Sequence, residues 1–398
     1  MRNYAHTLRA SYLAYIAQAI TNNFAPLLFF TLQSTYQLQV EQIAMLVGLN
    51  FGTQLLVNLF GAAFADKIGY RPLIVLAQIS AALGLIGLGV LPEILPSPYM
   101  GLLLSVTLFG IGGGFTEALV SPIVEACPTE KKAASMSLLH SFYCWGLAAV
   151  ILLSTLFFLV FGMENWRILA YLWALIPLCN TFYFSKVPIS QLNPSGEGMS
   201  ARSLLSSNLF WLLILLMVCA GASEVAMSQW SSFFAEVELG IPKAIGDLAG
   251  PGIFAVLMGI SRVFYSKFSD KLNLQKFMIG SGCLSVVTYL AAAFSPSPLL
   301  GLIAIALCGL SVGVLWPGAL SIASELCPKG GTPLFALLAL GGTLGCTIGP
   351  MAVGMVAGAA AGGIRTGLSI GAAFPVLLIV GIVFLMTRFQ YRSDKKTG

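Results

Sequence analysis

The chain has 398 residues, of which 58% are hydrophobic and only 9% are charged, with a formal net charge of +5. Soluble domains carry about 25% charged residues, so this composition excludes an ordinary water-soluble protein and predicts a chain embedded in lipid. The small positive charge gives no indication of a nucleic-acid partner.

Twelve apolar runs are long enough to cross a bilayer, whose hydrocarbon core takes roughly 20 helical residues. Backbone groups that face lipid must be satisfied within the chain, so each run is predicted to be a transmembrane helix. The predicted fold is therefore an all-α membrane protein with twelve transmembrane helices. In chain order the spans are 10–32, 42–65, 72–91, 99–123, 134–161, 168–185, 208–235, 243–265, 276–294, 298–323, 332–358 and 366–388.

The longest polar stretch, residues 186–207, separates the spans into two sets of six. It contains two prolines and two glycines, which favour loop structure. We therefore predict an N-terminal six-helix bundle over residues 1–185, a cytoplasmic linker over 186–207 and a C-terminal six-helix bundle over 208–398.

The positions of the basic residues predict how the spans are oriented. If the N-terminus is cytoplasmic, only Arg167, Lys243 and Arg365 of the twenty Lys and Arg lie on the outer side. Cytoplasmic loops carry an excess of Lys and Arg, so both termini are predicted to be cytoplasmic. The short loops and compact length point to a plasma membrane, in this case a bacterial inner membrane.

Two short motifs recur at nearly the same distance in both halves. The charged loop that starts at Asp66-Lys67 has a weaker copy at Asp270-Lys271, 204 residues later. The segment V-E-A-C-P at 124–128 returns as S-E-L-C-P at 324–328, 200 residues later. These echoes predict a duplicated chain. Halves of this kind pack about an axis along the membrane normal and enclose a site near the midplane.

The loop F-A-D-K-I-G-Y-R at residues 64–71 resembles the signature loop of the major facilitator superfamily. The twelve spans, the central linker and the second loop agree with that family, and the resemblance covers essentially the whole chain. It implies two pseudo-symmetric six-helix bundles that rock about a central cavity, which opens to each side of the membrane in turn.

Seven charged residues near the inner ends of the spans are predicted to form a gate. The resemblance implies that such clusters hold the inner side closed in the outward-facing state. An ion pair that is dry in one state and wet in the other differs in strength between the states. The alternative is that these charges only fix the topology. The predicted gating residues are Asp66, Arg71 and Glu125 in the first bundle and Arg262, Asp270, Lys276 and Glu325 in the second.

Ionisable residues at membrane depth cost a few kcal/mol each by insertion scales, so each is a candidate functional residue. Glu117 lies in the middle of span four, Glu224 in the middle of span seven and His140 in the inner half of span five. We predict that these three residues exchange protons, with Glu117 as the main carrier. The alternatives are a permanently protonated Glu117, a Glu224 paired at the bundle interface and a packing histidine. No Lys or Arg is expected at mid-depth, which disfavours organic anions as substrates.

Amide and aromatic side chains at helical spacing complete the predicted solute site. Asparagine side chains both donate and accept hydrogen bonds, and tryptophan rings stack on apolar ligand surfaces. Trp145 and Trp173 are instead expected to pack against protein. The predicted solute-contacting residues are Asn22, Asn23, Glu117, His140, Tyr143, Glu224, Trp230 and Trp316.

Span one, A-I-T-N-N-F-A-P-L-L, and span five, S-L-L-H-S-F-Y-C-W-G, resemble the fucose permease-like sugar–proton symporters. The resemblance implies a secondary active transporter that moves a small neutral polar solute, a sugar above all, by alternating access with proton symport. Those symporters often carry an acid in span one, where this chain has Phe24-Ala25-Pro26. The rival interpretation is a proton-coupled exporter of amphipathic or cationic compounds. A third interpretation is a transporter-like sensor that binds a ligand without moving it across the membrane.

Several other function classes have no support in the sequence. It contains no metal-ligand cluster, nucleophile elbow or phosphate-binding loop, so neither an enzyme nor a cofactor or metal is expected. The eight cysteines form no C-x-x-C pair and are expected to be packing residues. The expected partners are a small-molecule solute, protons and the lipid bilayer, and the protein is expected to be a monomer.

Overall fold

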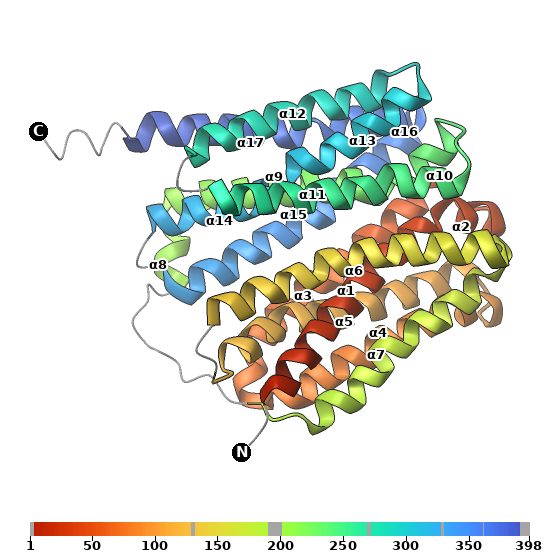
Figure 1. Ribbon diagram of the computed structural model, residues 1–398, viewed down its shortest axis with the longest axis horizontal. Coiled ribbons are helices and arrows are strands. Elements are labelled where there is room, and N and C mark those ends of the chain that lie inside the picture. Colours follow the sequence, from red (N-terminus) through yellow and green to blue (C-terminus); the bar gives the residue numbers. More distant parts are fainter. Residues whose placement is uncertain are drawn as a thin grey trace, which may run out of the picture. The chain divides into compact units, whose positions relative to one another are not determined.

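The computed structural model describes residues 4–128, 132–189, 201–268, 272–327, 330–360 and 362–390. These residues form helices and turns, with no strand among them (Figure 1). Eleven helices are long and apolar enough to cross a membrane, or twelve when the bent pair α1 and α2 counts as one span. The predicted all-helical membrane fold is thereby confirmed.

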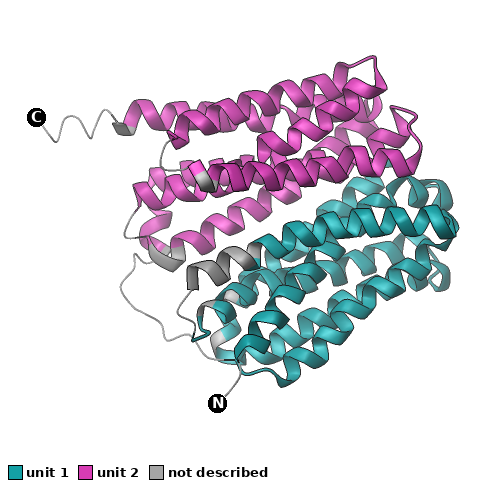
Figure 2. Ribbon diagram, viewed as in Figure 1, with its two compact units in different colours: residues 1–195 teal, residues 196–398 magenta. Residues whose placement is uncertain are grey.

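The chain divides into two compact units, residues 1–195 and 196–398 (Figure 2). The boundary falls within the predicted linker. The helices of unit 1 are α1 (Tyr4–Leu27), α2 (Phe29–Tyr36), α3 (Val40–Ile68), α4 (Tyr70–Ile94), α5 (Pro98–Glu125), α6 (Lys132–Phe161), η1 (Met163–Asn165) and α7 (Trp166–Lys186).

Unit 2 has more breaks within its spans than unit 1. Its helices are α8 (Ala201–Leu205), α9 (Asn208–Val237), α10 (Lys243–Asp247), η2 (Leu248–Gly252), α11 (Ile253–Phe268), α12 (Leu274–Phe294), α13 (Pro298–Val312), α14 (Leu315–Leu326), α15 (Gly331–Ala359), α16 (Gly363–Gly371), α17 (Ala373–Leu385) and η4 (Met386–Gln390).

Prolines account for the breaks within the spans of unit 2. A proline has no N–H, and its ring clashes with the carbonyl four residues earlier. Pro317 lies just after the break between α13 and α14, and Pro375 just after the break between α16 and α17. Pro251 lies inside the π-helical turn η2 that joins α10 to α11. In unit 1, the 52° bend between α1 and α2 lies two residues after Pro26, whereas the proline acts on the turn before it, so this bend is not explained in the same way.

Glycines let helices approach closely in both units. On α5, an added Cβ at Gly112 would lie 2.9 Å from the backbone of α4, and one at Gly114 would lie 2.6 Å from the backbone of α3. On α15, a Cβ at Gly345 would lie 2.0 Å from the Val218 carbonyl of α9. The glycine runs of spans four and eleven therefore serve close packing.

Equivalent arginines tie helices together in the two units. Arg167, in the first turn of α7, pairs with Glu93 near the end of α4 and donates to a tyrosine hydroxyl at the end of α2. Arg365, in α16, donates to Glu238 just after α9 at 3.1 Å and to the Ser295 carbonyl just after α12 at 2.8 Å. Each arginine thus joins the first, third and sixth spans of its unit, as expected for a duplicated chain.

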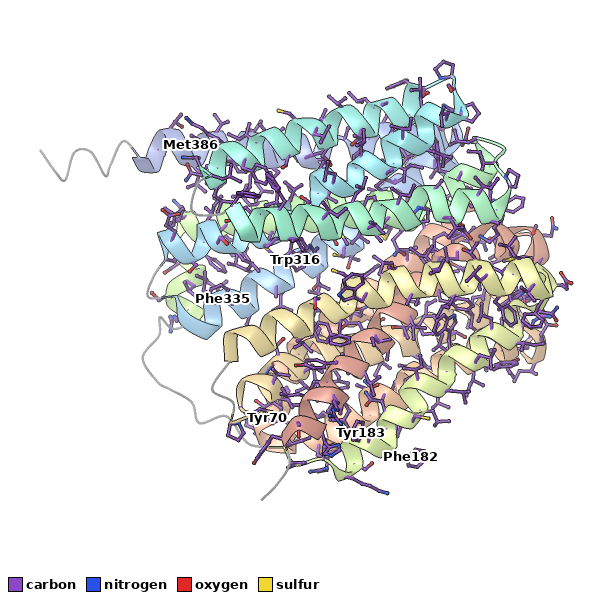
Figure 3. All side chains as sticks on the ribbon, in the orientation of Figure 1. Tyr70, Phe182, Tyr183, Trp316, Phe335 and Met386 are labelled. Carbon is purple, nitrogen blue, oxygen red and sulfur yellow. The ribbon has the colours of Figure 1, made fainter. Side chains whose placement is uncertain are left out.

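Large apolar side chains cover much of the surface of both units, as suits a protein in lipid (Figure 3). Trp173 is buried and donates to Ser154 Oγ at 3.1 Å, as expected for a packing residue. The same expectation is wrong for Trp145, which is 69% exposed. Its position on α6 points away from the packed side of the helix, which the sequence periodicity did not reveal.

The two copies of the E-x-C-P motif end equivalent helices. Cys127 follows α5 and Cys327 follows α14. The Cys127 thiol is buried and donates a hydrogen bond to the Ile123 carbonyl at 3.3 Å. Burial raises the pKa of the Cys127 thiol to about 11 and also raises the pKa of Cys327, because a low-dielectric surrounding disfavours the thiolate.

A variant that keeps Cys127 as its only cysteine should react slowly with N-ethylmaleimide at pH 8. With a pKa of about 11, only about one thiol in a thousand is ionised at that pH. Mass spectrometry of the protein in detergent should show a rate that rises roughly tenfold per pH unit to pH 10. The matched variant that keeps only Cys327, which is less buried, should react faster at every pH. A Cys127 rate that levels off near pH 9 would contradict the buried thiol.

Candidate functional site

Three amide side chains form a buried cluster between α1 and α3 in unit 1. Asn22 Oδ1 accepts hydrogen bonds from Gln54 at 2.8 Å and Asn50 at 3.4 Å, and Gln54 also donates to Asn50 at 3.2 Å. All three residues are buried. Gly113 on α5 makes room for Gln54, since a Cβ there would lie 2.7 Å from the amide. These amides satisfy one another, as buried polar groups generally must.

Glu117 lies midway along α5, half-buried, beside residues of α1 and α6. The Tyr15 hydroxyl of α1 is 3.3 Å from Ser121 Oγ, one turn further along α5. Glu117 and Tyr143 both lie close enough to that hydroxyl to interact with it electrostatically. Asn23 Nδ2 donates to the Tyr143 hydroxyl at 3.4 Å. The structure therefore brings Glu117 and Tyr143 together at Tyr15, and Asn23 joins them through its bond to Tyr143.

Aromatic rings continue this side of unit 1. Tyr12 of α1 and Phe142 of α6 stack with ring centroids 4.6 Å apart and an interplanar angle of 9°. Both rings and Tyr143 are partly buried and pack against the apolar cluster that contains Tyr15. We call Glu117 and these four aromatic residues the acid–aromatic surface. Aromatic faces attract cations, so rings beside a carboxylate suit an organic cation.

Glu224 is paired within unit 2. Its carboxylate lies 3.2 Å from a guanidinium nitrogen of Arg262 on α11. Arg262 Nε also donates at 3.2 Å to the Gly313 carbonyl, which Pro317 leaves without a helical N–H partner. The sequence left Glu224 either facing the cavity or paired at the bundle interface, and in the structure it pairs with Arg262 of the same unit.

One expectation about basic residues is wrong at Arg262. Its guanidinium bonds to the Gly313 carbonyl and Glu224 in the middle of spans ten and seven, so a basic group does reach mid-depth. The physical reason is the break between α13 and α14, whose free carbonyl draws the long side chain across from α11. The sequence argument against organic anions therefore loses its basis. The predicted role of Arg262 in gating stays a prediction.

The two tryptophans of the predicted solute site both join helices of unit 2. Trp230 has no exposed surface, and its Nε1 donates to the Pro350 carbonyl of α15 at 2.9 Å. Trp316, labelled in Figure 3, is partly buried. Its ring fills the space beside Gly342, where an added Cβ would lie 2.1 Å from it. Trp230 can touch a solute only if α9 and α15 separate.

Arg71 binds the end of α7. Its guanidinium donates to the main-chain carbonyls of Phe184 at 2.8 Å, Ser185 at 2.6 Å and Val187 at 2.7 Å. The last carbonyls of a helix have no intrahelical partners, and a cation at this end also interacts favourably with the helix dipole. Arg71 thus fixes the short loop between α3 and α4 against the sixth span, whatever further role it has in gating.

The other predicted gating residues are only partly visible. Among the described residues, neither Lys276 nor Glu325 forms an ion pair, and both side chains are exposed. The gate stays a prediction. The side chains of Asp66, Glu125 and His140, and the whole of Asp270, lie outside the described part of the chain.

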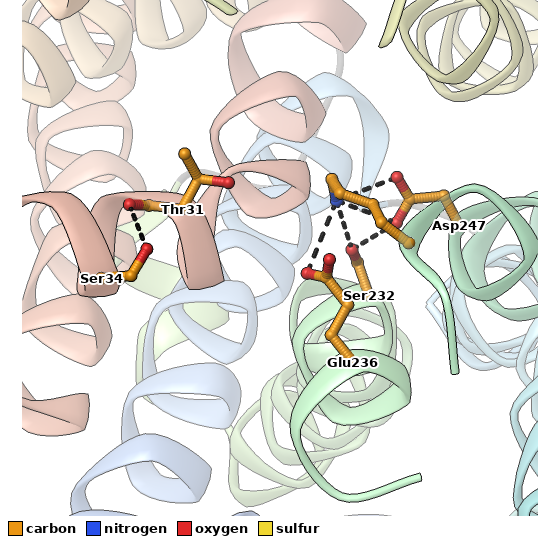
Figure 4. A network of polar contacts seen from close by, with 6 residues as sticks. Thr31, Ser34, Ser232, Glu236 and Asp247 are labelled. Carbon is orange, nitrogen blue, oxygen red and sulfur yellow. Dashed lines mark hydrogen bonds and ion pairs between the residues drawn. The ribbon is translucent and has the colours of Figure 1, made fainter. Parts of the chain in front are cut away.

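A charged network that the sequence analysis missed lies where α9 meets α10 (Figure 4). Lys243 Nζ is 3.0 Å from Asp247 Oδ2, 3.7 Å from Glu236 Oε2 and 3.3 Å from Ser232 Oγ. The Ser232 hydroxyl also donates to Asp247 Oδ1. We call these four residues the Lys243 network. Its signal in the sequence was an i, i+4 pair of opposite charges at the start of a predicted span.

The sequence analysis also missed the amides of α3. Asn50, Gln54 and Asn58 recur every four residues within an apolar run, which places them on one face of a helix. All three are buried. A polar stripe within a transmembrane span must face other protein groups, so this periodicity was enough to find the amide cluster.

The comparisons with known proteins agree with this architecture. A model of the Major Facilitator Superfamily matches residues 11–332 and 251–398. The chain is 24% identical over 295 residues to the multi-drug resistance efflux pump PmrA of Streptococcus pneumoniae, covering 72% of each protein. It is 26% identical over 299 residues to the PmrA homolog of Lactococcus lactis, covering 72% of this chain and 71% of that one.

Solved structures share the fold at low sequence identity. A bacterial homolog of the human lysosomal transporter Spinster, in an inward-facing and occupied conformation, has a TM-score of 0.74 at 16% identity, covering 96% of this chain and 97% of that one. The nucleoside transporter NupG has a TM-score of 0.76 at 13% identity, covering 95% and 99%. The chain is therefore a multi-pass membrane transporter, not an enzyme, and it belongs to the major facilitator superfamily.

Proposed function

We propose that this transporter is a proton-coupled exporter of amphipathic or cationic compounds, working by alternating access. The observation that carries the proposal is the acid–aromatic surface of unit 1, where Glu117 interacts with the Tyr15 hydroxyl and the other three rings pack against the apolar cluster that contains Tyr15. A carboxylate attracts the charge of an organic cation, and aromatic rings accept both its charge and its apolar body. The relatives named as multi-drug resistance efflux pumps support export over uptake.

In the proposed cycle, a proton and the exported cation compete for Glu117. The ionised carboxylate binds the cation from the inner side, and a proton that arrives from the outer side displaces it. A bare carboxylate is costly to enclose away from water, so the transporter changes state only with one of the two bound. This exchange couples export to the proton gradient. The proposal includes cytoplasmic termini in a bacterial plasma membrane, as the distribution of basic residues predicts.

Proton symport of a sugar is the second candidate, and the amide cluster of unit 1 favours it. Amides donate to and accept from hydroxyl groups. However, Asn22, Asn50 and Gln54 already bond to one another in a buried position, so a sugar would have to replace these bonds. The efflux-pump relatives and the pairing of these amides both support export better than uptake.

Proteoliposomes with a trapped pH dye and a preacidified interior separate the two candidates. Adding a lipophilic cation such as tetraphenylphosphonium should raise the internal pH, because the entering cation exchanges for a proton. Glu117→Gln cannot bind the proton, so this signal should fall to the level of empty vesicles. The exposed Glu164→Gln serves as the matched control and should respond like wild type.

Two results would contradict this proposal. Internal acidification on adding a sugar, with no response to cations, would assign the protein to sugar–proton symport. A Glu117→Gln variant that still exchanges cations for protons at the wild-type rate would remove Glu117 from the mechanism.

Variants of the Glu224–Arg262 pair separate a structural role from proton transfer. Glu224→Gln leaves the Arg262 charge without its partner, which should cost about 1–3 kcal/mol of stability for a partly buried pair. Melting in detergent should show this loss, and Glu224→Gln combined with Arg262→Gln should recover most of it.

Transport by the same double variant shows which role Glu224 has. If Glu117 alone carries the proton, the double variant should exchange cations for protons at close to the wild-type rate. A double variant that is stable but has lost proton-coupled exchange would instead make Glu224 a proton carrier.

A further inference from the structure

The Lys243 network holds two carboxylates against one ammonium group. The side chains of Lys243, Glu236 and Asp247 are 15%, 11% and 0% exposed. With all three groups ionised, the network carries one excess negative charge in a place that water barely reaches. An unbalanced buried charge is strongly unfavourable, and a single added proton would remove it.

The two carboxylates are held unequally. Asp247 accepts the Ser232 hydroxyl at Oδ1 and lies 3.0 Å from Lys243 at Oδ2. Glu236 Oε2 and Asp247 Oδ2 are both buried without a hydrogen-bond partner among the described residues, but Asp247 also accepts Lys243 Nζ at Oδ1 at 3.2 Å, whereas Glu236 has only the ammonium group 3.7 Å away. Hydrogen bonds and close cations favour the ionised form of a carboxylate. Asp247 is therefore the group that keeps its charge, and Glu236 is the group that takes the proton.

Among the described side chains, Lys243 is the basic group that contacts Glu236 and Asp247. On α9, the next acid is Glu238, which is balanced by Arg365 of α16 at 3.1 Å. On α11, Arg262 is engaged with Glu224 in the middle of the span. The titratable residue of α13 is Cys308, whose buried thiol carries no positive charge. The balance within the network therefore depends on its own members.

The network belongs to one half of the duplicated chain. The two charged loops that relate the halves lie 204 residues apart, and at this offset Lys243 and Asp247 correspond to Gln39 and Ile43. The ion pairs of Arg167 with Glu93 and of Arg365 with Glu238, in contrast, occur at equivalent places in both units. A six-span bundle of this architecture thus forms without such a network, which favours a functional reason for it.

We propose that the Lys243 network is a second proton-binding site, with Glu236 as its acceptor. Protonation of Glu236 removes its attraction for Lys243, which leaves the ammonium group to Asp247 one turn away in α10. The side-chain contacts between the end of α9 and α10 then depend on the Ser232 hydroxyl, which contacts both Lys243 and Asp247, next to the π-helical turn η2. The link between spans seven and eight is thereby sensitive to pH, independently of which solute is transported.

Infrared difference spectroscopy on the purified full-length protein tests the proposal directly. Spectra between pH 5 and pH 9 should contain the C=O band of a carboxylic acid that appears as the pH falls. Glu236→Gln should lack one such component, whereas the matched control Glu238→Gln should retain it because that carboxylate is balanced by Arg365. An unchanged band in Glu236→Gln would overturn the proposal.

A second variant keeps the test decisive if Glu236→Gln does not fold. Lys243→Gln removes the ammonium group, so the midpoint of the Glu236 band should move up by about one pH unit or more. A midpoint that stays in place would also overturn the proposal. These bands do not depend on export: a protein that moves no cations would still display them, so failure of the proposed function and failure of this inference are separate results.

Discussion

Every polar group of this protein that faces lipid needs a partner from the protein itself, since lipid offers none. Helical hydrogen bonds satisfy most of the backbone, but a proline within a helix leaves the carbonyl four residues earlier without its helical partner. At Gly313, the carbonyl freed by Pro317 is taken by Arg262, which is then placed to pair with Glu224. One backbone break thus fixes the position of the basic group that reaches mid-depth in unit 2.

Comparing the two units separates the features that both six-helix bundles share from those that only one of them has. Both units use an arginine at the start of the sixth span to hold the first and third spans. At the 200-residue offset of the E-x-C-P motif, however, Glu117 in unit 1 corresponds to Pro317 in unit 2. Equivalent positions therefore hold the acid Glu117 in unit 1 and Pro317 in unit 2, where the helix break frees a carbonyl that binds Arg262.

The helices could be predicted from the sequence because the lengths of the apolar runs and the short charged turns between them determine where the helices begin and end. Periodicity also places residues on a helix face, as for the stripe of Asn50 and Gln54. Partners are harder to predict, because a long side chain reaches across neighbouring helices to wherever a polar group is free. Arg262 is the example: its position near the end of span eight suggested the inner surface, whereas its partners lie in the middle of spans seven and ten.

Charge distribution gives the strongest reason to place cation binding in unit 1. In unit 2, the mid-span carboxylate of Glu224 is matched by a guanidinium group that would repel an incoming cation. In unit 1, Glu117 interacts with the Tyr15 hydroxyl, whose ring belongs to the aromatic group of α1 and α6, and we expect the aromatic faces there to attract a cation. A proton and a cation then act on the same group with the same sign of charge. In the proposed cycle, competition between them for Glu117 is what couples export to the proton gradient.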